Sequence, residues 1–349
     1  MRVGARGRGV SRLELLVTLG VVCALTMLLV RGYRRPRPDD TPPPRLVYTP
    51  IAPLPTPVLG PGVAAVGDLI YVIGGNTVAG EATDLVQAYN TRTDQWDERR
   101  ARVLTPRAGL GAAALGTDIY AVGGYAGPRS LATVEVYHTA EDRWDPGPDL
   151  PAANTYGDGV KACAERIYAI GGYTSEHGCS DQVYSLDPAR LKLGWQHATS
   201  KPAAAAAFAA LVEYTWICCL GGHTGGQLGV CLRDVDAYDA LGGRWDSRLP
   251  LLPTALTACT GAALHHTYYV FGGGQYDKHQ VQPTVLRLCP GRKAWEHDTD
   301  LPNPRRQMAA VTVGESIYLI GGDGPGRERG ECWRARPGPS REAGRTAAP

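Results

Sequence analysis

Histidines, carboxylates and nucleophiles are the residue types that support metal binding or catalysis, and this sequence spaces them in none of the common patterns. It has 8 histidines but no HExxH or DxDxDG spacing, and neither a GxSxG motif nor a phosphate-binding loop. The longest loops place His177 beside Glu176 and His279 at the end of the run 275–279. A metal needs three or four converging ligands. We therefore predict no metal, no cofactor and no catalytic residue.

The cysteines leave two interpretations open. Cys23 lies in an apolar N-terminal segment, and the other eight are Cys163, Cys179, Cys218, Cys219, Cys231, Cys259, Cys289 and Cys332. No CxxC pair exists, so a zinc ribbon is poorly supported. An even number suits disulfides in an exported domain, whereas free cysteine is also a common buried side chain. Adjacent Cys218 and Cys219 would point to opposite faces of a strand, and we expect one of them in the core.

Two arginines occupy the same place in a repeated pattern. Arg107 and Arg305 each follow a proline and precede a double glycine by sixteen residues, and Arg306 comes next. In the other copies this place holds Val58, Thr155, Ala205 and Leu256. The residues directly after the double glycines are Asn76, Tyr125, Tyr173, His223, Gly274 and Asp323. Whether these positions meet in space depends on the elements that carry them.

Those elements form a repeat. A hydrophobic strand ending in two glycines recurs six times, with first glycines at Gly74, Gly123, Gly171, Gly221, Gly272 and Gly321, at intervals of 49, 48, 50, 51 and 49 residues. A tryptophan follows each of the first five pairs: Trp96, Trp144, Trp195, Trp245 and Trp295. Tyr89, Tyr137, Tyr184 and Tyr238 mark the middle of the first four intervals, and Leu286 replaces them in the fifth. The composition agrees, because 44 glycines and 27 prolines indicate many short strands and tight turns.

The double glycine, the spaced tyrosine and tryptophan and the period of about 50 resemble the kelch repeat, over about residues 45–335. The resemblance implies an all-β propeller with six blades of four strands each. The segments 109–115, 204–211, 257–264 and 308–313 are rich in small residues, as a crowded inner strand requires. We expect the tyrosines and tryptophans to be wedges between blades. Residues 46–57, with Tyr48 in the tryptophan place, should supply the outer strand that the sixth copy lacks and so close the ring.

The propeller geometry brings the repeated positions together. The loops after the second strands, such as 76–83 and 125–132, should lie on one face around a central mouth. Kelch domains that bind acidic peptides or sugars use arginines on this face, so the resemblance implies Arg107, Arg305 and Arg306 as ligand contacts. The other candidate ligand contacts, around the central mouth, are Asn76, Tyr125, Tyr173, His223 and Asp323. The alternative is structural: a Pro-Arg pair that begins a blade, with the arginine capping a neighbouring carbonyl.

The N-terminus predicts a membrane anchor. A basic leader (1–12) precedes an apolar segment (13–31) of spanning length, a proline-rich linker (32–44) follows, and residues 336–349 form a polar tail that we expect to be disordered. Arginines flank the apolar segment on both sides, so its orientation is undecided. Gly9, Val10 and Glu14 resemble the processing site of type IV prepilins and pseudopilins, and an uncleaved signal anchor is the alternative. Both place the propeller outside the cytoplasm.

These patterns predict a membrane-tethered kelch propeller that binds a protein or a glycan on its loop face without catalysis. The net charge of +2 and the scattered basic residues argue against nucleic acid as a partner. The alternative is an extracytoplasmic sugar-active enzyme, such as a sialic acid mutarotase, which would need only a few polar groups at the mouth. Arg107, Glu176 and Arg305 are the candidates for that role.

Overall fold

The computed structural model describes residues 42–155, 157–174, 176–225, 229–275, 280–325 and 330–339. The apolar segment 13–31, Gly9, Val10, Glu14 and most of the polar tail lie outside these ranges, and the predictions made for them stay predictions. Within the described ranges, no helix combines the length and the apolar character that crossing a membrane requires.

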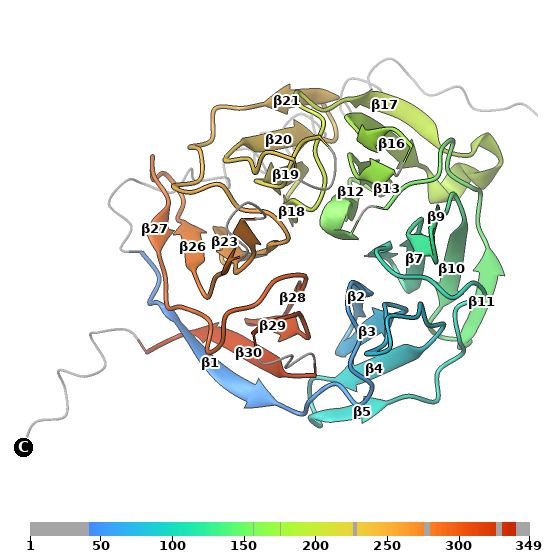
Figure 1. Cartoon of the computed structure of the whole chain (residues 1–349), viewed down its shortest axis with the longest axis horizontal. Coiled ribbons are helices and arrows are strands. Elements are labelled where there is room, and N and C mark those ends of the chain that lie inside the picture. Colours follow the sequence, from blue (N-terminus) through green and yellow to red (C-terminus); the bar gives the residue numbers. More distant parts are fainter. Residues whose placement is uncertain are drawn as a thin grey trace, which may run out of the picture. The chain divides into compact units, whose positions relative to one another are not determined.

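The described residues from 42 onward fold into six four-stranded antiparallel sheets arranged around an axis (Figure 1), as predicted. Blade 1 holds β2 (Gly62–Val66), β3 (Leu69–Ile73), β4 (Val86–Asn90) and β5 (Gln95–Asp97); blade 2 holds β6 (Gly111–Leu115), β7 (Asp118–Val122), β10 (Val134–His138) and β11 (Arg143–Pro146); blade 3 holds β12 (Val160–Cys163), β13 (Arg166–Ile170), β16 (Gln182–Leu186) and β17 (Gln196–Ser200). Blade 4 holds β18 (Ala209–Glu213), β19 (Trp216–Leu220), β20 (Val235–Asp239) and β21 (Arg244–Asp246); blade 5 holds β22 (Thr260–Leu264), β23 (Thr267–Phe271), β26 (Val285–Leu288) and β27 (Glu296–His297); blade 6 holds β28 (Ala309–Val313), β29 (Ser316–Ile320), β30 (Cys332–Pro337) and β1 (Leu46–Ile51).

Smaller elements decorate this frame. Three two-stranded hairpins extend the loops after the second strands of blades 2, 3 and 5: β8 (Tyr125–Ala126) with β9 (Arg129–Ser130), β14 (Tyr173–Thr174) with β15 (Gly178–Cys179), and β24 (Gly274–Gln275) with β25 (Gln280–Val281). Two 3-10 segments, η1 (Gly157–Gly159) and η2 (Pro188–Leu193), both belong to blade 3.

The innermost strands are the small-residue segments that the sequence predicted. Each contacts the next around the axis, and β28 contacts β2, so the inner ring is closed. Figure 1 shows β2, β12, β18 and β28 near the centre. Alanine and glycine dominate them because neighbouring inner strands lie too close for large side chains.

Aromatic side chains fill the space between blades. Tyr71 of blade 1 meets Tyr137 of blade 2 edge-on at 5.6 Å, and Tyr168 of blade 3 meets Tyr238 of blade 4 in the same way. On the outer strands, Trp144 donates its indole N–H to the Ala101 carbonyl of the preceding blade at 2.8 Å. The prediction of wedges between blades is confirmed, and these side chains are structural.

The closing strand behaves as predicted. β1 pairs with β30 along its whole length, so the start of the propeller completes its last blade (Figure 1). Tyr48 lies in the tryptophan place. Its hydroxyl donates to the Thr299 carbonyl of blade 5 at 2.9 Å, as Trp144 and Trp295 donate to their preceding blades. A ring closed in this way leaves no sheet edge open at the junction of its ends.

The double glycines serve a close approach between blades. Within the six pairs, φ lies between +57° and +67° at the first glycine and between +87° and +98° at the second. A Cβ added to Gly74 would lie 2.4 Å from the Arg107 carbonyl oxygen of the next blade. Both the backbone conformation and the missing side chain are therefore required there.

This contact yields a stability prediction. Gly74→Ala should lower the free energy of unfolding by more than about 2 kcal/mol, because a left-handed conformation costs a non-glycine residue about 1–2 kcal/mol and the backbone clash adds to it. Gly67→Ala is the matched control, since Gly67 has φ +58° but no atom within 4 Å of its added Cβ. Denaturant unfolding followed by tryptophan fluorescence measures both. Equal losses for the two variants would contradict the clash.

Candidate functional site

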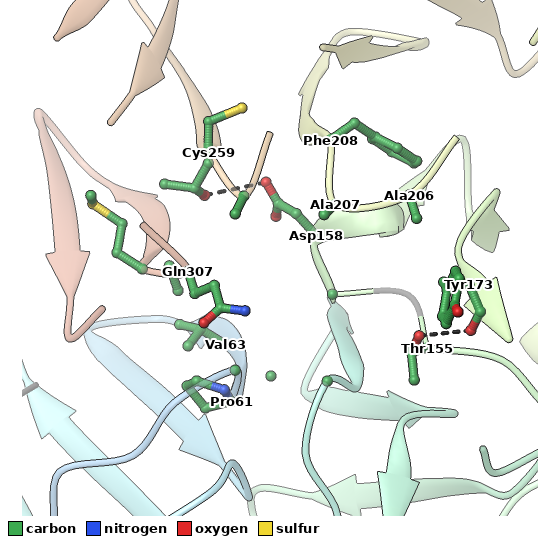
Figure 2. A pocket seen from close by; sticks show the side chains of 18 of the residues that line it. Pro61, Val63, Thr155, Asp158, Tyr173, Ala206, Ala207, Phe208, Cys259 and Gln307 are labelled. Carbon is green, nitrogen blue, oxygen red and sulfur yellow. Dashed lines mark hydrogen bonds between the residues drawn. The ribbon is translucent and has the colours of Figure 1, made fainter. Parts of the chain in front are cut away.

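A cavity of about 570 Å³ opens on the axis at the end where the loops after the second strands lie. We call it the axial cavity. Its polar lining residues are Tyr125, Thr155, Asp158, Tyr173, His223, Thr260 and Gln307, and its apolar ones include Pro61, Val63, Ala112, Phe208, Cys259 and Met308. Residues from all six blades therefore meet there, which no single repeat could achieve (Figure 2).

The rim of the cavity is a set of equivalent residues with left-handed backbone. They are Gly60, Gly109, Gly157, Ala207, Ala258 and Gln307, with φ between +49° and +61°. Neighbours bond across blades, as in Gly109 N–H to the Gly60 carbonyl at 2.8 Å and Gln307 N–H to the Ala258 carbonyl at 2.8 Å. The first three blades have glycine here, whereas blade 6 sends the Gln307 side chain toward the cavity (Figure 2).

Tyr125 uses the space that glycine leaves. A Cβ on Gly109 would lie 2.7 Å from the Tyr125 ring, so the ring packs directly on this backbone. Asn76 donates from its side-chain nitrogen to the Tyr125 hydroxyl at 2.5 Å. Asn76 does not itself line the cavity; it fixes the position of a residue that does.

Tyr173 and His223 also line the cavity, as predicted for the residues that follow the double glycines. The Tyr173 carbonyl accepts a hydrogen bond from the Thr155 hydroxyl at 2.7 Å (Figure 2). His223 is largely buried, and its Nδ1 lies 3.0 Å from the Thr257 hydroxyl. Burial lowers the pKa of His223, which keeps the ring neutral at pH 7.

Arg107 and Arg305 do not lie in the mouth, where the sequence interpretation placed them as ligand contacts. Arg107 is 0% exposed; its guanidinium pairs with Glu135 and donates to the carbonyls of Gly123 and Thr133 at 3.1 and 2.8 Å. Arg305 makes the same set of contacts in blade 6 with Glu331 and the Gly321 carbonyl. Neither side chain lines the cavity. The structure favours the structural alternative, in which arginine caps a carbonyl at the start of a blade.

The other two charged candidates pair with each other. Arg306 and Asp323 face one another across a backbone bridge, with their side chains 3.6 Å apart. Neither is among the residues that line the cavity. Of the eight predicted ligand contacts, the structure thus brings Tyr125, Tyr173 and His223 together and leaves the five others behind or beside them.

Sequence reasoning missed Asp158. In blade 3 the residue that bonds the glycine carbonyl in the manner of Arg107 is Asn154, whose side-chain nitrogen donates to Gly171 at 2.8 Å. Asn154 precedes the double glycine by seventeen residues, so the constant offset of sixteen placed Thr155 one position too far along. Asp158 itself precedes the double glycine by thirteen residues, a position that Pro61, Leu110, Phe208, Cys259 and Met308 hold in the other copies. A charged residue at an otherwise apolar repeated position was the available signal.

The remaining reactive groups do not form a further site in the described ranges. All eight described cysteines are free, and both Cys218 and Cys219 are buried, where one was expected. Cys259 lines the cavity, but burial raises the pKa of its thiol to about 12. The described residues hold no group of three metal-ligating side chains. Glu176 is 83% exposed and contacts neither buried arginine, so the set predicted for a sugar-active enzyme is not assembled; residues 276–279 lie outside the described ranges.

Comparison with known proteins agrees with this architecture. Residues 57–99 and 106–151 match the Kelch motif. Kelch-like protein 25 of Xenopus tropicalis is 29% identical over 110 residues, which span 30% of this chain and 18% of that protein. The solved structure of YjhT superposes with a TM-score of 0.68 over 82% of this chain and 95% of that one; at 15% identity, this likeness shows the fold alone. The chain therefore matches the Kelch motif over its first two repeats, and it shares its fold with that solved structure.

Proposed function

We propose that this propeller is a recognition module that binds its ligand in the axial cavity without transforming it. The observation that carries the proposal is the cavity itself, a concave site of about 570 Å³ lined by polar groups from several blades on an otherwise apolar surface. Small-molecule and side-chain binding sites have this composition and size. The loop face around it is also where strands of six blades end together.

The polar groups of the cavity are held in place before any ligand arrives. Asn76 fixes the Tyr125 hydroxyl, and Thr155 is bonded to the backbone of Tyr173. Preorganisation of this kind lowers the entropic cost of binding. Ala207, Ala258 and Gln307 adopt left-handed conformations at the rim, and such strained backbone often clusters at ligand sites.

A mixed library tests the proposal with the full chain. Neutral sugars, sugar acids, amino acids and short acidic or basic peptides are screened by thermal shift, and affinities of the hits are measured by calorimetry. Tyr125→Phe and Thr155→Val should each weaken binding about 2- to 10-fold, the value of one neutral hydrogen bond.

Tyr214→Phe is the matched control. Tyr214 is an exposed tyrosine in the turn between β18 and β19, at the opposite end of the inner strand from the cavity. The Tyr214→Phe variant should leave the affinity for the ligand unchanged. Hits that bind equally well to all three variants would show that the ligand site lies elsewhere, and a library without hits would count against small-molecule recognition at this mouth.

A further inference from the structure

We infer that the axial cavity selects uncharged, hydroxyl-rich ligands, namely neutral saccharides, and rejects anions, because a fixed carboxylate, Asp158, closes its inner end. The inference rests on the proposed function and names the ligand class for that site. It reverses the expectation of an acidic ligand, which depended on Arg107 and Arg305.

Asp158 crosses the axis and ties four blades together. Its Oδ1 accepts from Lys161 Nζ of blade 3 at 2.5 Å, and its Oδ2 accepts from the Ala210 N–H of blade 4 at 2.9 Å and the Thr260 hydroxyl of blade 5 at 3.2 Å. The Thr260 hydroxyl oxygen in turn accepts from the Ala310 N–H of blade 6 at 3.2 Å. In Figure 2 a dashed line joins the Asp158 carboxylate to the segment that carries Cys259.

This relay sets the depth of the cavity. The inner strands β18, β22 and β28 leave N–H groups unpaired on the side of the axis, and the carboxylate and the threonine hydroxyl satisfy three of them. The lining residues extend no deeper than this level. The cavity therefore has a floor, and its ligand must be compact rather than an extended chain threaded along the axis.

The described lining of the cavity offers an anion no cation, because the lysine that pairs with Asp158, Lys161, does not line it. Asp158 is the single charged residue among the described side chains that line it, and no described lysine or arginine does so. Lys161 is already bonded to Asp158 and is not a lining residue. An anionic ligand would lose part of its hydration, find no lining cation to pair with among the described residues and face the carboxylate side of the Asp158–Lys161 pair, which is unfavourable.

The walls suit a hydroxylated ring. Thr155 and Tyr173 form one side, and Pro61 and Val63 form another (Figure 2); Tyr125 and Met308 also line the cavity. Hydroxyls both donate and accept, so they match tyrosine and threonine hydroxyls, the Gln307 amide and a carboxylate acceptor. The C–H surface of a sugar ring can pack on the apolar side. A saccharide presents both kinds of surface at once.

Matched sugar pairs test the inference with the full chain. Glucose and glucuronate, and galactose and galacturonate, differ only in a CH₂OH group against a carboxylate. Titration calorimetry and saturation-transfer NMR should show each neutral sugar binding at least about 10-fold more tightly than its acid. Gln307→Lys adds a cation at the rim and should reduce this preference at least about 5-fold, while Gln307→Met, the uncharged control, should leave it unchanged. Melting temperatures establish that each variant is folded.

Each result bears on the inference separately from the proposed function. Uronates that bind as tightly as neutral sugars, with binding weakened by Tyr125→Phe, would overturn the inference and leave the axial cavity as the recognition site. The absence of any saccharide binding, beside a peptide hit that depends on Tyr125, would do the same. Saccharide binding that neither Tyr125→Phe nor Gln307→Lys changes would overturn both the inference and the axial cavity as the recognition site.

Discussion

Arg107→Ala is expected to lower the free energy of unfolding by about 3–5 kcal/mol, the cost of leaving one partner of a buried ion pair without the other. The Arg107 guanidinium is fully buried and pairs with Glu135, which is also buried and accepts the Leu104 N–H at 2.7 Å. Without the arginine, a buried carboxylate and the carbonyls of Gly123 and Thr133 lose their partner together.

Chemical denaturation measures this loss, with Arg99→Ala as the control. Arg99 also pairs with a carboxylate, Asp97, but its side chain is 91% exposed, and its removal should change stability little. Replacing both Arg107 and Glu135 by apolar residues of similar volume should recover much of the loss, because no buried charge then remains. A folded Arg107→Ala protein with normal stability and lost ligand binding would return Arg107 to the ligand site.

Asp298→Ala is expected to release the closing strand and to cost about 3–5 kcal/mol. Asp298 is 0% exposed; its Oδ1 accepts the Leu46 N–H of β1 at 2.8 Å, and its Oδ2 lies 3.1 Å from the Arg287 guanidinium. Arg287 also donates to the Pro43 carbonyl at 2.9 Å, just before β1 begins. The pair therefore fastens the start of β1 to blade 5. Its loss leaves the buried Leu46 N–H without its acceptor and leaves Arg287 with Glu296, 3.3 Å away, as its remaining carboxylate.

Hydrogen exchange localises the effect. Amide protection over residues 46–51 should fall more in Asp298→Ala than protection in the inner strands, since opening the closure need not unfold the other blades. Asp300→Ala is the control, because Asp300 is about half exposed and bonds only His297 in the same turn. Asp298→Asn keeps an acceptor for Leu46 and should fall between the two. Unchanged exchange at 46–51 would show that the strand is held by its pairing with β30 alone.

The blade architecture could be predicted because its signals are local and repeated. A glycine pair is needed wherever backbone with positive φ passes a carbonyl of the next blade. Tyrosine and tryptophan recur wherever the space between two neighbouring blades must be filled. Tyr48 stood in the tryptophan place of an otherwise incomplete repeat, which was enough to predict that the first strand closes the last blade.

The site could be predicted only in part. Of the residues that follow the double glycines, Tyr125, Tyr173 and His223 line the axial cavity, because the glycine turn directs the next residue toward the mouth. The arginines were misplaced, since the side-chain type at a repeated position does not say whether it points into the sheet or toward the axis. Their carboxylate partners lie 28 and 26 residues away in the same blades, Glu135 in β10 and Glu331 just before β30.

The sequence by itself determined the number of blades, the identity of their inner strands and the way the ring closes. The repeats can be counted, each contains its own inner strand, and the sixth lacks the outer strand that residues 46–57 supply. Only the tertiary structure decided what occupies the axis. Asp158 bonds residues 52 and 102 positions away, in two other blades, and these become neighbours only when the ring is complete. A carboxylate at the centre of a propeller is a property of the closed ring, and no single repeat contains the contacts that hold it there.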